Sequence, residues 1–223
     1  MIVSDLIKHQ LAPKGALRAG INLSNFLLVS SKSAGGRPEG ISPDIAKRVA
    51  ARLDVPCEFI IYDRPGKLAD AVTDDIWDIG NIAFEVERAK TVNFNNPYVI
   101  IEANFLVWKA DDFRANDDVD CESVRIAVSE RSAYDLWLTK NFNSAKIIRV
   151  PSIQAAHDLF FEKKVDVLAS LKPKIIDDIK NNNNICLIEP PFTAVKQSIG
   201  VPKGKPEAIN LINELISSSI KSG

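Results

Sequence analysis

The sequence predicts an α/β protein of two similar lobes, each a mainly parallel sheet covered by helices, joined by a hinge that the chain crosses twice. Three observations lead to this prediction. Apolar strand-like segments alternate with amphipathic helical segments, and the connections between them are short. The alternation runs over 18–88 and starts again over 125–178. Two further segments, 102–112 and 195–204, lie where the chain would cross between the lobes.

Local signals mark the first elements. Leu6, Ile7 and Leu11 have helical spacing, and the chain then turns at Pro13 and Gly15. The first series follows. In chain order it has a strand over 16–23, a turn-rich loop over 30–40, a helix over 42–54, a strand over 56–63, a helix over 66–75, a strand over 77–84 and a helix start over 85–92. Its first helix is expected to begin with Ser42 as the N-cap and Pro43 at the first helical position.

The second series repeats this order. It has strands over 123–129, 145–151, 165–171 and 185–192, and helices over 132–142, 152–164 and 172–182. An amphipathic helix over 205–220 follows the second crossing. We therefore expect residues 1–106 with 199–223 to form lobe 1 and residues 107–198 to form lobe 2. Because ligands of such sheets sit beyond the carboxyl ends of the strands, we expect a small molecule in a cleft between the lobes.

The composition limits the possible partners. Of the 223 residues, 46% are hydrophobic and 26% are charged, which is ordinary for a globular protein with a sizeable core. The net charge is −1 and no block of like charges stands out. Neither nucleic acid nor insertion into a membrane is therefore expected.

The N-terminal segment and the cysteines bear on the compartment. Charged and polar residues from Asp5 to Gln10 interrupt every apolar run near the start, so no signal peptide is expected. Cys57, Cys121 and Cys186 are odd in number and widely spaced, which favours reduced thiols. The sequence as it stands predicts a cytoplasmic protein, or a periplasmic one if a leader has been removed.

Five segments in order resemble solute-binding protein family 3, the type II periplasmic-binding-protein fold of polar amino-acid uptake systems. They are LRAGI (17–21), EGISPDIAKRVAARLDVP (39–56), DIGNIAFEVERAKTVNFNNPYV (78–99), RIAVSERSAYD (125–135) and SIGVPKGKPEAINLINELI (198–216). The resemblance implies a two-lobe protein that binds a small solute, with an ABC permease as a possible partner if the protein is exported.

The resemblance implies that Arg88 grips a carboxylate of the solute. Its rigid guanidinium fork matches a carboxylate in a bidentate way. The helix start expected beside it would add unpaired N–H groups and a positive dipole end. The alternative is a salt bridge from Arg88 to Glu85, Glu87 or a neighbouring helix.

Other family positions in lobe 1 are altered. Asn81 and Ala83 stand where the family commonly has hydroxyl side chains, and Glu85 stands where a capping threonine is usual. Asn25 takes the place of an aromatic residue that commonly stacks on the ligand. Lys67 lies in a tight turn before a helix, and it either points into the cleft or is a solvated lysine.

Lobe 2 departs from the family in two places. Ser132 is expected to cap a helix and to offer its backbone N–H to an anion, while Arg131 replaces a glycine and either adds charge near the cleft or faces solvent. The family's amine-binding aspartate is replaced by Leu171, and Lys172 follows it. A ligand ammonium would lose its counter-charge there, so the expected solute is a small anion.

Two classes of function remain open. The first is a solute-binding protein with no cofactor or metal, since neither His9 nor His157 has metal-type spacing to another ligand. The second is a lyase of the cyclohexadienyl (prephenate or arogenate) dehydratase type, which the same fold also houses. That reaction needs a positioned acid in a closed site. Glu85, Glu130 and Lys172 are the candidates, and none lies in a catalytic motif.

Overall fold

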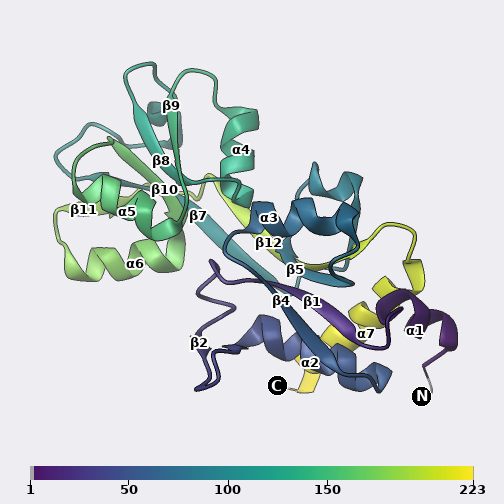
Figure 1. The fold of residues 1–223 in the computed structure, drawn as a ribbon. Coiled ribbons are helices and arrows are strands. Elements are labelled where there is room, and N and C mark those ends of the chain that lie inside the picture. The colour runs from purple at the N-terminus through teal and green to yellow at the C-terminus, as the bar shows by residue number, and fades with distance from the viewer. Residues whose placement is uncertain (1–2, 223) are drawn as a thin grey trace. The chain divides into compact units, whose positions relative to one another are not determined.

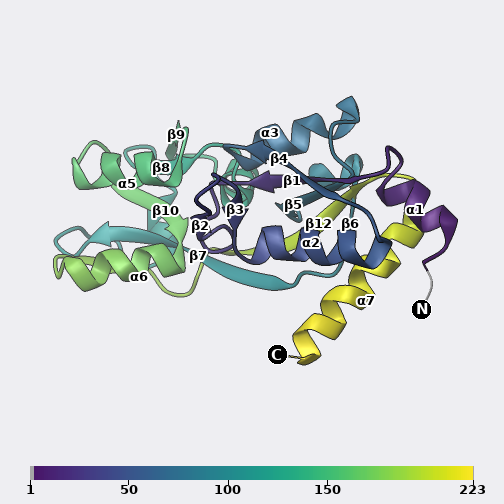
Figure 2. The same cartoon turned by 60° about the horizontal axis from the view of Figure 1, so that its bottom comes forward.

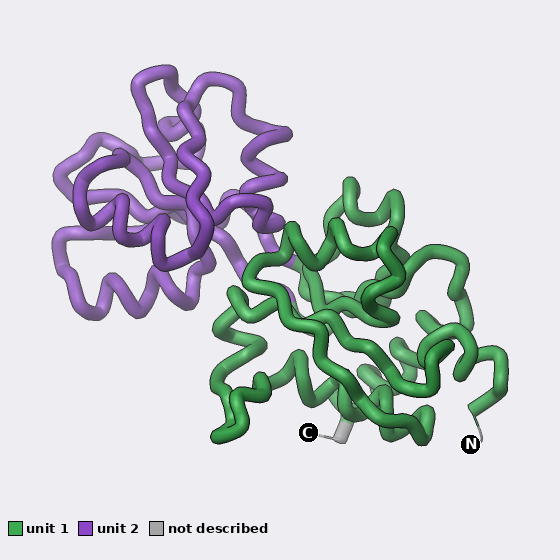
Figure 3. The backbone as a smooth tube through the Cα atoms, in the orientation of Figure 1, with its two compact units in different colours: residues 1–99, 196–223 green, residues 100–195 purple. Residues whose placement is uncertain are grey.

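The protein is described here by a computed structural model covering residues 3–222 (Figure 1). The chain divides into two compact units (Figure 3): unit 1 comprises residues 1–99 and 196–223, and unit 2 comprises residues 100–195. Strands β7 (Val99–Trp108) and β12 (Thr193–Pro202) contain the two boundaries, so the chain passes between the units inside strands. The boundaries expected from the sequence, after residues 106 and 198, lie in the same two strands.

The structure has one ten-stranded mixed sheet, in place of the separate sheet in each lobe that the sequence predicts. Its part in unit 1 follows the order β4–β1–β5–β12, with β6 also paired to β12. Pairing is parallel among β4, β1 and β5 and antiparallel at β12. The strands are β1 (Leu17–Asn22), β4 (Cys57–Tyr62), β5 (Ile79–Ala83) and β6 (Val92–Phe94). The helices are α1 (Asp5–Leu11), α2 (Ile41–Leu53), α3 (Pro65–Asp70), the 3-10 turn Ala71–Asp74 and α7 (Pro206–Ser222). The predicted parallel series is present, and the returning strand β12 makes the sheet mixed.

Two apolar layers cover this sheet. One packs α2 and α7 against side chains such as Ala19 and Ile21 of β1, and the other packs α3 around Leu68 and Trp77. Figure 2 shows α2 and α7 on one side of the sheet and α3 on the other. Because β1 and β5 are parallel neighbours, the residues that follow these two strands lie at one edge of the sheet.

Unit 2 contains the other part of this sheet, ordered β7–β10–β8–β9, with β11 paired to β7. Its strands besides β7 are β8 (Arg125–Ser129), β9 (Lys146–Val150), β10 (Val167–Leu171) and β11 (Ile185–Leu187). Its helices are the 3-10 turn Asn116–Val119, α4 (Ala133–Asn141), α5 (Ile153–Phe161) and α6 (Lys172–Asn181). β8, β9 and β10 are parallel, whereas β7 and β11 run antiparallel to their neighbours.

Three local expectations differ from the structure. The loop over 30–40 contains a small hairpin, β2 (Ser31–Lys32) with β3 (Pro38–Glu39). α2 has Gly40 as its N-cap in place of Ser42. This position needs glycine, because its φ is +127° and an added Cβ would lie 2.7 Å from the carbonyl oxygen of Leu28. The helix start over 85–92 is one 3-10 turn, η2 (Arg88–Lys90), since β6 begins at Val92 and leaves no room for another turn.

Candidate functional site

Arg88 is held inside unit 1, at the end of a central strand. Its residue is only 6% exposed, and its Nη1 donates a 2.9 Å hydrogen bond to the carbonyl oxygen of Ala83, the last residue of β5. The carbonyl of Glu85 accepts from the N–H of Ala89, which closes the turn that carries the arginine. The expected helix N-terminus beside Arg88 is absent, because η2 is a single 3-10 turn. The guanidinium itself, and no helix dipole, is therefore the positive group at this end of β5.

Asn81 lies two residues before Ala83 on β5. It is 4% exposed, and neither its Nδ2 nor its Oδ1 has a hydrogen-bond partner within residues 3–222. Its neighbours across the sheet are Ile21 of β1 and Ile199 of β12. An unpaired buried amide costs about 1–3 kcal/mol, and such groups are uncommon enough in folded proteins to require an explanation.

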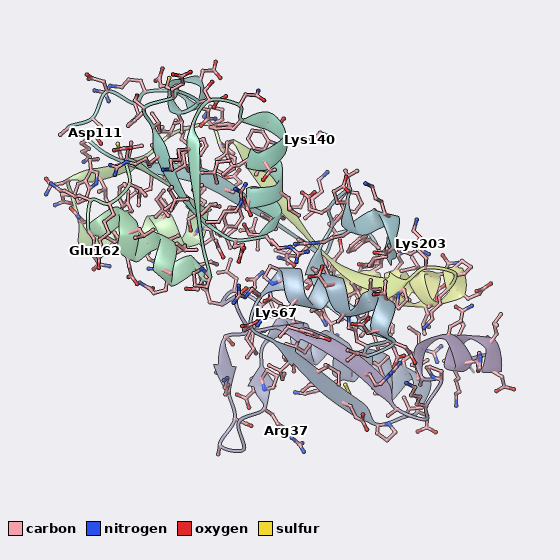
Figure 4. All side chains as sticks on the ribbon, turned by 45° about the horizontal axis from the view of Figure 1, so that its top comes forward. Arg37, Lys67, Asp111, Lys140, Glu162 and Lys203 are labelled. Atoms are coloured by element: carbon pink, nitrogen blue, oxygen red, sulfur yellow. The ribbon has the colours of Figure 1, made fainter. Side chains whose placement is uncertain are left out.

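The other lobe 1 candidates have local structural partners. The Oδ1 of Asn25 accepts from the N–H of Leu27 at 3.2 Å, so this asparagine closes the turn after β1. Lys67 extends from α3 at the surface (Figure 4), where its Nζ lies 2.8 Å from Asp63. The carboxylate of Glu85 accepts from the N–H of Val86. None of these contacts is specific to a ligand.

The first candidates of unit 2 follow strand β8. Ser132 caps α4 as expected, and its Oγ accepts from the N–H of Asp135 at 3.1 Å. Arg131 has a left-handed backbone, with φ of +55°, and its N–H donates to the Asp135 carboxylate at 2.6 Å. Asp135 also receives the Nε of Arg149 at 2.9 Å. Burial nevertheless raises the pKa of Asp135, against the lowering effect of these donors.

Lys172 is the first residue of α6 and binds two carboxylates. Its Nζ lies 2.6 Å from Oε2 of Glu102 and 2.9 Å from Oε1 of Glu189. The hydrogen bond to Glu102, followed by that to Glu189, raises the pKa of the lysine, which therefore stays charged. Leu171, just before it, is buried and caps α6 without a side-chain hydrogen bond. Sequence reasoning placed a positive charge here but missed the acidic pair.

A second polar cluster lies in the interior of unit 2. The Nε2 of His157 is 2.8 Å from Oγ of Ser170, and its Nδ1 is 2.5 Å from Oδ2 of Asp178. His157 of α5 and Ser170 of β10 are both buried, so no substrate reaches this Ser–His–Asp arrangement. The sequence analysis found no partner for His157, since no other ligand lies at metal-type spacing from it. Its contacts come from β10 and α6, which follow it in the chain.

Unit 1 also has two hollows. One, of about 790 Å³, is bounded by the β2–β3 hairpin, which carries Arg37 (Figure 4), and by β4. The other, of about 370 Å³, is bounded by residues that include Phe84, Phe94 and Lys196. Arg88 lines neither of them, so its role does not depend on these hollows. Within the described residues, no helix has both the length and the apolar character of a membrane span.

Comparison with known proteins places the chain. The family model of bacterial extracellular solute-binding proteins, family 3, matches residues 17–223. No curated protein is significantly similar to the sequence. Solved structures share its fold, the α/β fold of type II periplasmic binding proteins.

Three solved structures illustrate the likeness. A mutant of ArgBP from T. maritima has a TM-score of 0.79 at 20% identity, over 98% of this chain and 94% of that one. The ancestral amino acid-binding protein AncCDT-1, a precursor of cyclohexadienyl dehydratase, has a TM-score of 0.78 at 23% identity, over 98% and 94%. A putative binding component of an ABC transporter from Wolinella succinogenes, complexed with lysine, has a TM-score of 0.79 at 19% identity, over 94% and 92%. These identities are low enough that they show the fold alone. Because the family model covers nearly the whole sequence, the chain belongs to family 3 of the bacterial extracellular solute-binding proteins.

Proposed function

We propose that this chain is the solute-binding component of an ABC transporter, that units 1 and 2 are its two lobes, and that its solute is a small anion bearing a carboxylate. The family assignment supports solute binding. Arg88 supports the carboxylate, because it is a buried guanidinium at the carboxyl end of β5, where ligands of open α/β sheets bind. This one placement carries the proposal.

Each unit supplies groups suited to a small anion. In unit 1 they are Arg88 and the segment from Asn81 to Ala83, in which the buried side-chain amide of Asn81 has no hydrogen-bond partner among residues 3–222. In unit 2 they are the N-terminal end of α4, which Ser132 caps, and the charge of Arg131. The N–H of Ser132 itself donates to the carbonyl of Ser129, so it is not the group expected to meet the anion. Closure of the lobes over the solute needs only that the closed state binds it more tightly than the open state.

The anionic character of the solute rests on unit 2. Leu171 offers no charge to an ammonium group, and the two nearby carboxylates, Glu102 and Glu189, are already paired with Lys172. Leaving a buried ammonium without a counter-charge costs several kcal/mol, more than the roughly 0.5–1.5 kcal/mol that a neutral hydrogen bond returns. Among the structural neighbours, ArgBP is arginine-bound in one structure and the W. succinogenes protein is complexed with lysine. Our proposal therefore separates this chain from those proteins in charge selectivity.

Calorimetric titration with matched pairs tests the proposal. Each α-amino acid is compared with its 2-oxo analogue, which keeps the carboxylate and carbon skeleton and lacks the ammonium. We expect the 2-oxo acid to bind more tightly, with the loss of that binding in Arg88→Ala. Tighter binding of the amino acid, abolished by Glu85→Gln, would show instead that Glu85 holds the amine and that the solute is a zwitterion.

The dehydratase alternative gains no support from the side chains. Lys172 is held between two carboxylates that raise its pKa, which makes it a weaker acid. The carboxylate of Glu85 accepts from the adjacent backbone N–H of Val86. Incubation of the protein with prephenate and with arogenate, followed by product analysis, tests this alternative directly, and we expect no turnover.

A further inference from the structure

We infer that Lys172 sets the charge selectivity of the proposed site by filling, with its own ammonium group, a pair of carboxylates that would otherwise accept a cationic solute. This inference rests on the proposed function, since it concerns the unit 2 side of the same site. It differs from that proposal in assigning the exclusion of cations to an internal lysine.

The two carboxylates come from separate elements and converge on one point. Glu102 lies in β7 and Glu189 follows β11, and their oxygens are 2.6 and 2.9 Å from the Nζ of Lys172. The ladder between β7 and β10 pairs Ala103 with Leu171, so the next step places Glu102 opposite Lys172. The position of the acidic pair is therefore set by strand register as well as by attraction to the lysine.

Asn104 donates a hydrogen bond to one of the two acids, Glu189. It is fully buried, and its Nδ2 donates to the carbonyl of Ile188 at 2.9 Å and to Oε2 of Glu189 at 3.3 Å. Its Oδ1 has no hydrogen-bond partner in the described part of the chain. Glu189 is thus oriented by a group other than Lys172, and it would remain in place if the lysine were removed.

The cluster lies at the edge of the unit 2 sheet where a solute is expected. Lys172 directly follows β10, and Glu130 to Ser132 directly follow β8, which is parallel to β10 (Figure 1). The carboxyl ends of parallel neighbours share one edge. The side chains of Glu102 and Glu189 are about half exposed, at 45% and 54%, so a solute can reach them.

The charges explain the selectivity. One ammonium and two carboxylates give the cluster a net charge of −1, and removal of Lys172 would leave −2 at the same point. Two carboxylates about one ammonium form the kind of counter-charge that a free amino group or guanidinium requires. The tethered lysine competes with any such group at an effective concentration that a dissolved solute does not reach. A carboxylate solute does not compete for this position.

The test is to remove the internal ammonium and measure the binding of L-lysine and L-arginine by calorimetry. In Lys172→Met we expect at least a tenfold gain in affinity for both probes, and in Lys172→Arg no gain. Adding Glu102→Gln to Lys172→Met should abolish the gain. Lys180→Met is the matched control, because Lys180 is another ion-paired lysine of α6, bonded to Asp177 near the opposite end of the helix from Lys172.

The outcomes separate the two proposals. This inference would be overturned if Lys172→Met, with an unaltered melting temperature, bound both probes no more tightly than the wild-type protein does. If Lys172→Met is unstable, Lys172→Gln provides the same readout. If adding Arg88→Ala to Lys172→Met leaves the raised affinity for both probes unchanged, the role of Lys172 is supported and that of Arg88 in the proposed function is contradicted.

Discussion

The guanidinium of Arg18 grips the carboxylate of Asp78 inside unit 1, with Nε 3.0 Å from Oδ2 and Nη2 2.7 Å from Oδ1. The N–H of Arg18 donates to the same Oδ2, and the N–H of Asp78 donates back to the Arg18 carbonyl. Arg125 and Asp166 make the same set of bonds in unit 2. Each pair joins an arginine at the start of one strand to an aspartate just before the parallel neighbour of that strand. The same ion pair therefore occurs at the equivalent place in both strand–helix series.

The two pairs differ in burial, and this difference gives a prediction about stability. Asp78 is fully buried, whereas the side chains of Asp166 and Arg125 are 33% and 44% exposed. Asp78→Asn should lower the free energy of unfolding by about 3–5 kcal/mol, because it leaves a largely buried guanidinium without its main counter-charge. Asp166→Asn, the matched control, should cost about 1 kcal/mol or less. Urea denaturation measures both, and equal costs would contradict the argument from burial.

His157 should make the stability of the protein depend on pH. Burial is the main cause that lowers the pKa of this histidine below its ordinary value of 6.5, against the raising effect of Asp178. Lys174 of α6 also lowers this pKa, and Asp158 of its own helix raises it. The unfolded chain therefore binds the proton more readily than the folded one. The contribution of neutral His157 to the free energy of unfolding is therefore fully present above about pH 6.5, and it is lost as the pH falls below that value.

The variant His157→Gln tests this dependence. It should flatten the part of the stability profile between pH 6.5 and 5, even if its stability at pH 8 is lower because Asp178 and Ser170 lose their partner. The control is His9→Gln, since His9 is exposed on α1. Denaturant unfolding at several pH values provides the measurement. A profile that is equally steep in wild type and His157→Gln would show that another group is responsible.

Arg88 should be needed for solute binding far more than for folding. Arg88→Ala should weaken the binding of the cognate carboxylate by about 1.5–3 kcal/mol, or roughly ten- to a hundredfold, which is the range for charge-assisted hydrogen bonds. Arg88→Lys should recover only part of this loss, because lysine keeps the charge and lacks the planar fork. Thermal-shift assays with and without solute make the comparison, with Arg37→Ala in the exposed hairpin as the control. Solute stabilisation that is intact in Arg88→Ala would contradict the assignment.

The three cysteines should react with thiol reagents in a fixed order. All three are free: Cys121 is exposed, and Cys57 and Cys186 are half-buried. Burial raises the pKa of the Cys57 thiol to about 11, which leaves little of the reactive thiolate at pH 8. In the native protein we expect Cys121 to react first and Cys57 slowly, and in denaturant all three to react at once. Mass spectrometry of partly labelled protein identifies the sites, and fast labelling of native Cys57 would contradict the prediction.

The sequence by itself determined the features that local signals specify. The N-cap Ser132 and the helix after it, the helix at Asp5–Leu11 and the parallel strand series follow from a cap and from hydrophobic periodicity, and the structure confirms them. The five segments that resemble the family, including the one around Arg88, likewise predicted the fold that the comparisons confirm. Each of these signals lies within a few residues of the feature it predicts.

Only the tertiary structure decided which side chains meet across the fold. Lys172 pairs with Glu102 and Glu189, and His157 meets Asp178 and Ser170, through contacts that no sequence spacing records. The same holds for the single 3-10 turn at Arg88, whose length is set by the start of β6 and not by its own helical propensity. The physical reason is that burial and strand register bring distant residues together, and charge pairing depends on distances that exist only once the chain has folded.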